Sequence, residues 1–370
     1  MDNMTETTLA DDGVILNRRL CLYPIYGVTD LDSRLMYYFV TYVPMHLFVE
    51  FFGVIGNGLS FVVLGLERPF TSTSVLLRCL AISDTLVLLG RFFFSTMVQL
   101  YQFLGVLPVY RKLYEMGYAY LWAFFWFAKT WSVYITIFVA AERYIAVCKP
   151  LRAASICTIR NARIVCLSAM IFSIVYRIPY LFPYTSQLKY DRCSKTYLPK
   201  LSYRPMNSNP FYVFIYQLFL HNFLMSWFPI FSMGFFTHRL ISALKKSASN
   251  TLSTSGGRVA DNVRATTIRV LAVVYIFIIL ELPGSLIQIV AVMRKYGYFS
   301  DKIDYWKYHY LLTFFYFLSV VNCFINFYIY CLTGSRFRRT LRKVLHLPKV
   351  IGRKCKAPTP GSADHYVGAQ

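Results

Sequence analysis

The chain has 370 residues, of which 56% are hydrophobic and only 15% are charged. A soluble protein of this length usually carries about 25% charged residues, so the composition indicates a membrane protein. The net charge of +22 would also suit a nucleic-acid-binding protein, but the placement of the basic residues described below argues against nucleic acid as a partner. We find no CxxC metal spacing and no HExxH, GxSxG or GxxxxGK motif, so we expect no enzyme.

The N-terminal segment, residues 1–36, is predicted to lie outside the cell. It has no basic start followed by an apolar stretch, so we expect no cleaved signal peptide and let the first membrane helix act as the targeting signal. The segment contains the sequon Asn3-Met4-Thr5, which predicts N-glycosylation on the extracellular side.

Seven apolar segments follow, each about as long as the 20 residues that a helix needs to cross a bilayer. Because the backbone must satisfy its own hydrogen bonds in hydrocarbon, we predict that all seven are helices. The fold class is therefore an all-α membrane protein, a seven-transmembrane helix bundle over residues 37–333. The predicted spans are 37–66, 75–100, 117–141, 163–182, 210–237, 270–293 and 308–333.

Residues 334–370 form a basic tail, which predicts a cytoplasmic C-terminus and therefore an extracellular N-terminus. The loop between the third and fourth spans is also basic and agrees with that orientation. Within the tail, apolar residues recur at helical spacing between Arg and Lys residues, which predicts an amphipathic helix in contact with lipid at the inner membrane surface. These apolar residues are Phe337, Leu341, Val344 and Leu345.

Several spans carry polar residues that a pure lipid anchor would not need. If they converge, a carboxylate among hydroxyl and amide oxygens could hold a small cation such as sodium, or a proton. The alternative is that they join helices, since Ser and Asn side chains bond across membrane helices. Both interpretations stay open for the set Asn57, Asp84, Ser132, Asn322 and Asn326.

The order of short motifs along the chain resembles the rhodopsin-like (class A) G-protein-coupled receptors. These motifs are Gly56-Asn57, LAISD, ERY, Pro229 in the fifth span, Pro283 in the sixth span, and NxxxY. More narrowly, the stretches ERYIAVCKPLRAASICT, FSIVYRIPYLFPY and NFYIYCLTGSRFRR look like the FMRFamide-type neuropeptide receptors. Asn326-Phe327 in particular stands where most of the superfamily has Asn-Pro.

The resemblance implies a plasma-membrane receptor for an amidated, FMRFamide-like neuropeptide, with a heterotrimeric G protein and arrestin as further partners. It implies that Arg143, between Glu142 and Tyr144, is the cytoplasmic switch residue, and that Tyr330 moves inward on activation. The polar set around Asp84 matches the family's sodium-linked pocket, so sodium is the only cofactor we consider.

Two departures from the family pattern affect these expectations. Tyr118 occupies the position of the family's usual third-helix cysteine, so Cys193 in the second extracellular loop needs another partner. Cys21 is the other cysteine expected outside the membrane, and we expect a Cys21–Cys193 disulfide. Val263 stands where an acid often holds the switch arginine, which predicts high basal activity.

Glu281 stands where the family has its toggle tryptophan, and Lys129, counted back from Arg143, is the facing position on the third helix. We predict a buried Lys129–Glu281 ion pair that replaces the toggle; the alternative is a protonated Glu281 beside a Lys129 bonded to carbonyls or water. A similar count predicts a pair between Glu50 and Arg91.

The expected ligand pocket lies on the face of the third helix that carries Lys129. We assign to it Arg91, Trp122, Phe125, Trp126, Lys129, Glu281, Gln288 and Tyr316. An alternative of the same fold is a chemosensory receptor for a small, acidic molecule recognised by Lys129 or Arg91. A transporter or channel is a further alternative, but the chain lacks the internal repeat of many transporters.

Overall fold

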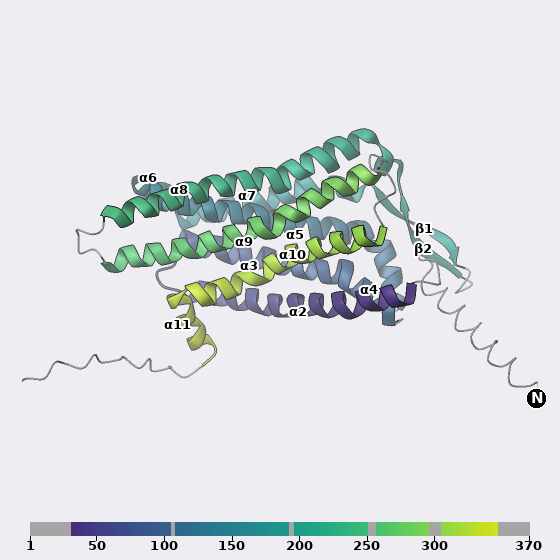
Figure 1. The fold of residues 1–370 in the computed structure, drawn as a ribbon, viewed down its shortest axis with the longest axis horizontal. Coiled ribbons are helices and arrows are strands. Elements are labelled where there is room, and N and C mark those ends of the chain that lie inside the picture. The colour runs from purple at the N-terminus through teal and green to yellow at the C-terminus, as the bar shows by residue number, and fades with distance from the viewer. Residues whose placement is uncertain (1–30, 105–107, 192–195, 251–256, 296–304, 347–370) are drawn as a thin grey trace, which may run out of the picture.

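The computed structural model describes residues 31–104, 108–191, 196–250, 257–295 and 305–346. In these residues long helices run side by side along one axis and form an elongated bundle (Figure 1). The first four helical segments are α2 (Leu31–Leu66), α3 (Ser72–Arg91) with η1 (Phe92–Thr96) and α4 (Met97–Leu104), α5 (Pro108–Cys148), and α7 (Ile159–Arg177) with η2 (Ile178–Leu181). The last three are η4 (Tyr212–Leu220) and η5 (Phe223–Trp227) leading into α8 (Phe228–Asn250), α9 (Gly257–Lys295) and α10 (Tyr305–Thr333).

The predicted seven-helix bundle is confirmed. Among the described residues, six helical segments are long and apolar enough to cross a membrane, and α9 adds a shorter apolar stretch, Leu271–Ile287. Most helices extend beyond the predicted spans. The sixth, for example, was expected over 270–293 and runs from Gly257 to Lys295, because a helix continues past the apolar stretch that the bilayer requires.

Short polar residues mark where several helices begin. The side chain of Thr71 accepts a hydrogen bond from the Ser74 backbone N–H at 3.3 Å and caps α3. Thr158 caps α7 in the same way, accepting from the Asn161 N–H at 3.2 Å. Each cap satisfies a backbone donor that the first helical turn leaves free.

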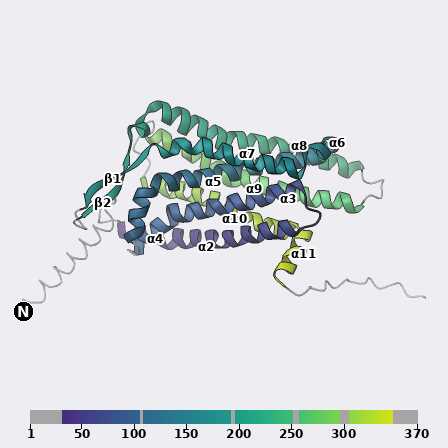
Figure 2. The ribbon, with the colours of Figure 1, turned by 180° about the vertical axis from the view of Figure 1, so that it is seen from behind.

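The two ends of the bundle differ (Figures 1 and 2). At one end, here named the hairpin end, β1 (Tyr184–Asp191) pairs antiparallel with β2 (Thr196–Tyr203). At the opposite end, named the α11 end, lie the short helices α6 (Pro150–Ile156) and α11 (Ser335–Val344). The sequence did not lead us to expect the hairpin, whose register places Tyr184 opposite Tyr203.

The predicted amphipathic helix is confirmed as α11. Its Phe337 is fully buried and contacts the rings of Phe327 and Tyr330, with centroids 6.0 and 5.6 Å apart. Arg342 and Lys343 lie in its last turn, where positive charge complements the helix dipole.

The centre of the bundle is α5, which packs against α3, α7, α8 and α9. Close approach of α3 depends on Gly90, because an added Cβ atom there would lie 3.2 Å from the Cα atom of Phe125. Small residues commonly permit such backbone contacts between membrane helices. Buried apolar side chains form one cluster toward each end of the bundle. Residues of α5 belong to both clusters, so this helix runs through two packed cores.

Candidate functional site

A buried ion pair joins α5 to α9 midway along the bundle. The Lys129 ammonium contacts the Glu281 carboxylate, and Ser319 of α10 donates to the same carboxylate at 3.0 Å. The Lys129 side chain is 6% exposed and that of Glu281 16%. The predicted pair is therefore confirmed, and Ser319 ties α10 into it. The pair and its hydroxyl partner hold three helices together, because separating opposite charges at such low exposure is costly.

The aromatic residues predicted on the same face of α5 divide into two groups. Phe125 and Trp126 are buried in the core toward the hairpin end, whereas Trp122 is only partly buried. Trp122 contacts the ring of Phe94 with centroids 4.8 Å apart, and Trp126 contacts the rings of both Trp122 and His221, with centroids 5.6 and 4.9 Å apart. Of this face, Trp122 is therefore more accessible to a ligand than its two neighbours.

Arg91 and Glu50 do not form the ion pair predicted for them. Arg91 donates to the Tyr42 hydroxyl at 2.5 Å, and its guanidinium lies 5.7 Å from the ring centre of Tyr316. Glu50 accepts a hydrogen bond from Thr96 at 2.8 Å. The count along the helices correctly placed Glu50 and Arg91 in the same region, but each charged group forms a hydrogen bond with a nearby hydroxyl instead. The two charges therefore share one polar cluster with separate partners.

The polar residues around Asp84 converge in part. Ser132 donates to one oxygen of the Asp84 carboxylate at 2.5 Å, and Asn326 donates to the other at 2.7 Å. Asn57 instead donates to the backbone oxygen of Cys323 at 3.0 Å. Asn322 is buried on α10 but makes no hydrogen bond to Asp84 within the described structure. The amide oxygens of Asn57 and Asn326 are both buried and have no hydrogen-bond partner among the described residues.

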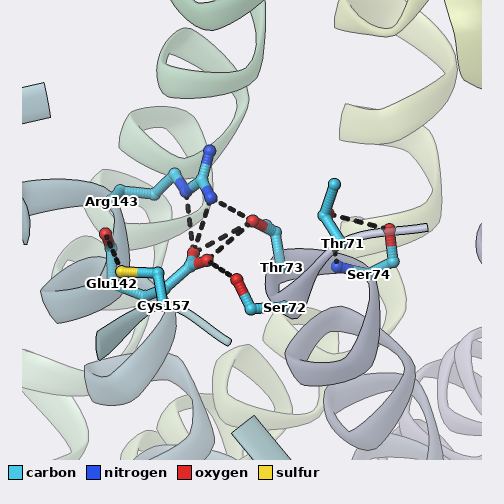
Figure 3. A network of polar contacts seen from close by, with 7 residues as sticks. All are labelled: Thr71, Ser72, Thr73, Ser74, Glu142, Arg143 and Cys157. Atoms are coloured by element: carbon cyan, nitrogen blue, oxygen red, sulfur yellow. Dashed lines mark hydrogen bonds and ion pairs between the residues drawn. The ribbon is translucent and has the colours of Figure 1, made fainter. Parts of the chain in front are cut away.

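A second charged network closes the α11 end of the bundle between α3 and α5 (Figure 3). The Arg143 guanidinium pairs with the Glu142 carboxylate, with Nη2 2.7 Å and Nε 2.9 Å from the same oxygen. Arg143 also donates to the Thr73 hydroxyl. Ser72 and Thr73 donate to Glu142 at 2.5 and 3.0 Å. Sequence reasoning missed Ser72 and Thr73, although both lie in the first turn of α3 beside its capping threonine.

The remaining residues assigned to this network lie at its border. Tyr144 contacts the ring of Phe236 on α8, with centroids 5.6 Å apart. The Lys149 ammonium lies 5.6 Å from the centre of the Tyr144 ring. Tyr330 is buried on α10 and contacts Phe337 of α11. Tyr144 therefore connects α5 with α8, and Tyr330 connects α10 with α11.

A family model described as "7 transmembrane receptor (rhodopsin family)" matches residues 56–330, a range that contains both charged networks and the Asp84 cluster. The chain belongs to this family. Rhodopsin-family members are multi-pass membrane receptors that signal without being enzymes, so the expectation of no enzyme holds.

Three curated relatives of this receptor give further detail. An FMRFamide receptor of Drosophila melanogaster is 23% identical over 288 residues, which cover 78% of this chain and 50% of the relative. Sex peptide receptor-related protein 2 of Caenorhabditis elegans is 24% identical over 347 residues, 86% of this chain and 74% of the relative. Probable G-protein coupled receptor frpr-1 of the same organism is 24% identical over 321 residues, 78% and 75% of the two chains. The receptor thus spans about half the length of the Drosophila relative.

The receptor anchors its hairpin to α5 without the family's usual third-helix cysteine. The Glu115 carboxylate accepts a hydrogen bond from the Leu201 N–H of β2 at 2.6 Å. One turn along α5, Tyr118 contacts the ring of Tyr184 at the start of β1, with centroids 4.9 Å apart. A cavity of about 420 Å³ lies between α5, η2 and the hairpin, and Arg204 lines it together with Glu115. Noncovalent contacts therefore stand where the family pattern has a disulfide.

Several predicted features lie outside the described residues. These are the sequon at Asn3 and the expected disulfide partners Cys21 and Cys193. Gln288 lies on α9, but its side chain is not among those described. The same holds for Val263, so the interaction of α9 with Arg143 stays a prediction.

Proposed function

We propose that this protein is a plasma-membrane receptor that binds an amidated peptide of the FMRFamide type and activates a heterotrimeric G protein. The peptide class is supported by the curated relatives, one of which is an FMRFamide receptor. The signalling part rests on one observation, the closed network of Glu142, Arg143 and Thr73 at the α11 end. In the proposal this network is the resting state of the switch.

Peptide recognition is proposed to centre on Glu281. An Arg-Phe-amide terminus carries a guanidinium, which binds a carboxylate through two parallel hydrogen bonds. Glu281 is the more accessible partner of the central ion pair, with its side chain 16% exposed against 6% for Lys129. The arginine of the peptide would compete with Lys129 for this carboxylate, because the planar guanidinium matches it better than an ammonium does. The phenylalanine would contact the partly exposed Trp122.

Release of Lys129 is proposed to free α9. Pro283 lies two residues after Glu281 inside this helix, where proline removes a backbone hydrogen bond and weakens the helix locally. With the ion pair intact, α9 is tied to α5 on the turn next to that weak point. Exchange of partners at Glu281 would therefore let the α11 end of α9 swing outward about Pro283.

At the α11 end, the swing is proposed to release Arg143 to the G protein. The guanidinium would leave Glu142 and Thr73, and Tyr330 would turn toward the space that α9 vacates. Ser72 and Thr73 would still donate to the Glu142 carboxylate, so that charge stays satisfied when the arginine departs. This lowers the cost of opening the network.

Sodium is proposed to bind at Asp84 in the resting receptor. The donor set fits a hard cation, since it offers one carboxylate, the Ser132 hydroxyl and the unpartnered amide oxygens of Asn57 and Asn326. A cation there would neutralise a carboxylate that is fully buried between α3, α5 and α10.

The orientation is proposed to place the hairpin end outside the cell and the α11 end in the cytoplasm. The basic last turn of α11 and its buried Phe337 suit a helix that contacts anionic lipid at the inner surface. Asn3 would then be available for glycosylation, and arrestin would share the cytoplasmic surface with the G protein.

The alternative ligand is a small acidic molecule in a chemosensory receptor of the same fold. Lys129 favours it, because its ammonium is a buried cation beside the carboxylate that is proposed to bind the peptide. The potency of a small acid should change when Lys129 is substituted and should not depend on the hairpin. The potency of a peptide should also fall when Glu115 is substituted.

The experiment that tests the proposal is a concentration–response screen in cells that express this chain. A library of Arg-Phe-amide peptides would be applied, with G-protein activation as the readout and surface expression measured in parallel. Arg143→Ala is the control for signalling, and a free-acid version of each active peptide is the control for the amide. A saturable response that both controls lose supports the proposal; no response from a receptor present at the surface contradicts the peptide assignment.

A further inference from the structure

Arg177, in the last turn of α7, is buried in the bundle with only 2% of its surface exposed. It lies four residues before the end of η2, within a segment apolar enough to cross the membrane. A guanidinium stays protonated in proteins, so this position holds a permanent positive charge. Such a charge requires compensation from its surroundings.

The hydrogen bonds of Arg177 go to neutral groups. Its Nε donates to the Thr130 hydroxyl of α5 at 2.8 Å, and Nη1 lies 3.1 Å from Nδ1 of His221. Because an arginine can only donate, Nδ1 of His221 must accept, and the imidazole is neutral. The Tyr180 hydroxyl lies 3.3 Å from the same nitrogen.

Aromatic rings supply the rest of the surroundings. The guanidinium carbon lies 4.5 Å from the ring centre of Tyr176, 4.9 Å from that of Tyr180 and 5.1 Å from that of Trp126. Cation–π contacts of this kind lower the cost of burying a cation. They cover the faces of the guanidinium and leave its net charge in place.

The missing element is a carboxylate. Among the residues that the structure describes, none forms an ion pair with Arg177, in contrast to Lys129, which sits next to Thr130 and has Glu281. Nη2 of Arg177 has no hydrogen-bond partner within this part of the chain. Nε1 of the adjoining Trp126 is also buried without one. One cluster thus holds a permanent cation and two nitrogen atoms whose N–H groups have no acceptor among the described residues.

We propose that this cluster is a binding site for a small monoanion, held by Nη2 of Arg177 with the indole N–H of Trp126 as the second donor. Such an anion would bind at the edge of the guanidinium, because aromatic rings cover its faces. The low exposure of the cluster restricts the ligand to about the size of chloride or a carboxylate group. This site goes beyond the proposed peptide function, because it can be filled with no peptide present.

Two sources could supply this chemistry: dissolved chloride, or a carboxylate carried by a ligand. The two sources can be distinguished by measuring the unfolding temperature of the purified receptor in a neutral detergent. Sodium chloride or sodium acetate would replace sodium gluconate, a bulkier anion, at constant ionic strength and constant sodium. Binding to the folded state raises the unfolding temperature with a saturable dependence on the anion. A rise with chloride indicates the dissolved ion, and a rise with acetate alone indicates a ligand carboxylate.

Three variants locate the effect. Arg177→Gln should abolish the anion dependence, and Trp126→Phe should weaken it while keeping a ring above the guanidinium. Arg152→Gln, at an exposed arginine of α6, should keep it in full. If Arg177→Gln does not fold, the wild-type titration and Trp126→Phe still decide. An unfolding temperature of the wild type that is the same in all three anions overturns the proposal, as does an anion dependence that survives in Arg177→Gln.

Discussion

The central ion pair predicts an unusual pattern of stabilities when its partners are removed one at a time and together. We consider Lys129→Met, Glu281→Met and the double variant, since methionine roughly keeps the side-chain length and removes the charge. Removing one partner of a buried pair typically costs about 3–5 kcal/mol, whereas replacing both with apolar residues is often neutral or stabilising. The double variant should therefore be more stable than either single one.

The two single variants should also differ from each other. Without Lys129, the Glu281 carboxylate keeps its hydrogen bond from the hydroxyl of Ser319, whose oxygen is 3.0 Å away. We expect Lys129→Met to lower the free energy of unfolding by about 1–2 kcal/mol, which is close to the cost of leaving one buried polar group without a hydrogen bond. Without Glu281, the Lys129 ammonium loses its carboxylate in a site where its side chain is 6% exposed. We expect Glu281→Met to reach the full range of about 3–5 kcal/mol.

The assay is thermal unfolding of the four purified proteins in one detergent, completed as a double-mutant cycle. Ser319→Ala serves as the matched control, because it removes one hydrogen bond to Glu281 and leaves both charges. Additive losses, with the double variant the least stable of the four, would refute the argument that these charges stabilise each other. Equal losses in the two single variants would refute the compensating role of Ser319.

Three further predictions concern the other parts of the site. Thr73→Val removes one acceptor and one donor from the network at the α11 end, so basal G-protein activation should rise several-fold, whereas Thr85→Val, at a hydroxyl bonded only to its own helix, should leave it unchanged. Glu115→Gln weakens a charge-assisted hydrogen bond to the hairpin, which is worth about 1.5–3 kcal/mol, and should reduce peptide potency at least five-fold. Unaltered potency would show that the hairpin takes no part in peptide binding. Asp84→Asn should abolish any effect of sodium concentration on peptide affinity, measured by competition binding with potassium as the replacement cation.

The helices and the Lys129–Glu281 pair could be predicted because both depend on position along a regular helix. Spans follow from the length of apolar runs, and the pair followed from counting residues between motifs that fix the depth of each helix. The same counting failed for Glu50 and Arg91. Counting residues gives the depth of a side chain in the bundle but does not identify its partners. The hydroxyls of Thr96 and Tyr42 form the hydrogen bonds with Glu50 and Arg91.

Features that depend on contacts between helices far apart in sequence were not predicted. Arg177 lies near the end of the fourth predicted span, 163–182, where a long side chain often reaches water, so its burial could not be expected from the sequence. Its burial follows from Thr130, His221 and Tyr180 meeting around it, and no periodicity in α7 indicates that. The role of Ser72 and Thr73 was missed for the same reason, since their acceptor Glu142 belongs to another helix.

The position of α5 explains why changes at one end of the bundle can reach the other. Lys129 and Arg143 lie on this one helix, and each ties α5 to a neighbour: Lys129 to α9 through its ion pair with Glu281, and Arg143 to α3 through a hydrogen bond to the Thr73 hydroxyl. Between them, Ser132 binds Asp84 of α3, which also binds Asn326 of α10. A helix held at three depths by polar contacts cannot move relative to its neighbours until those contacts exchange partners. When Glu281 exchanges Lys129 for another partner, the contacts of Ser132 and Arg143 with α3 stay intact, so the helix that is freed first is α9. Activation by displacement of Lys129 therefore requires α9 to move and α5 to stay, which distinguishes it from any mechanism in which α5 itself shifts along the bundle.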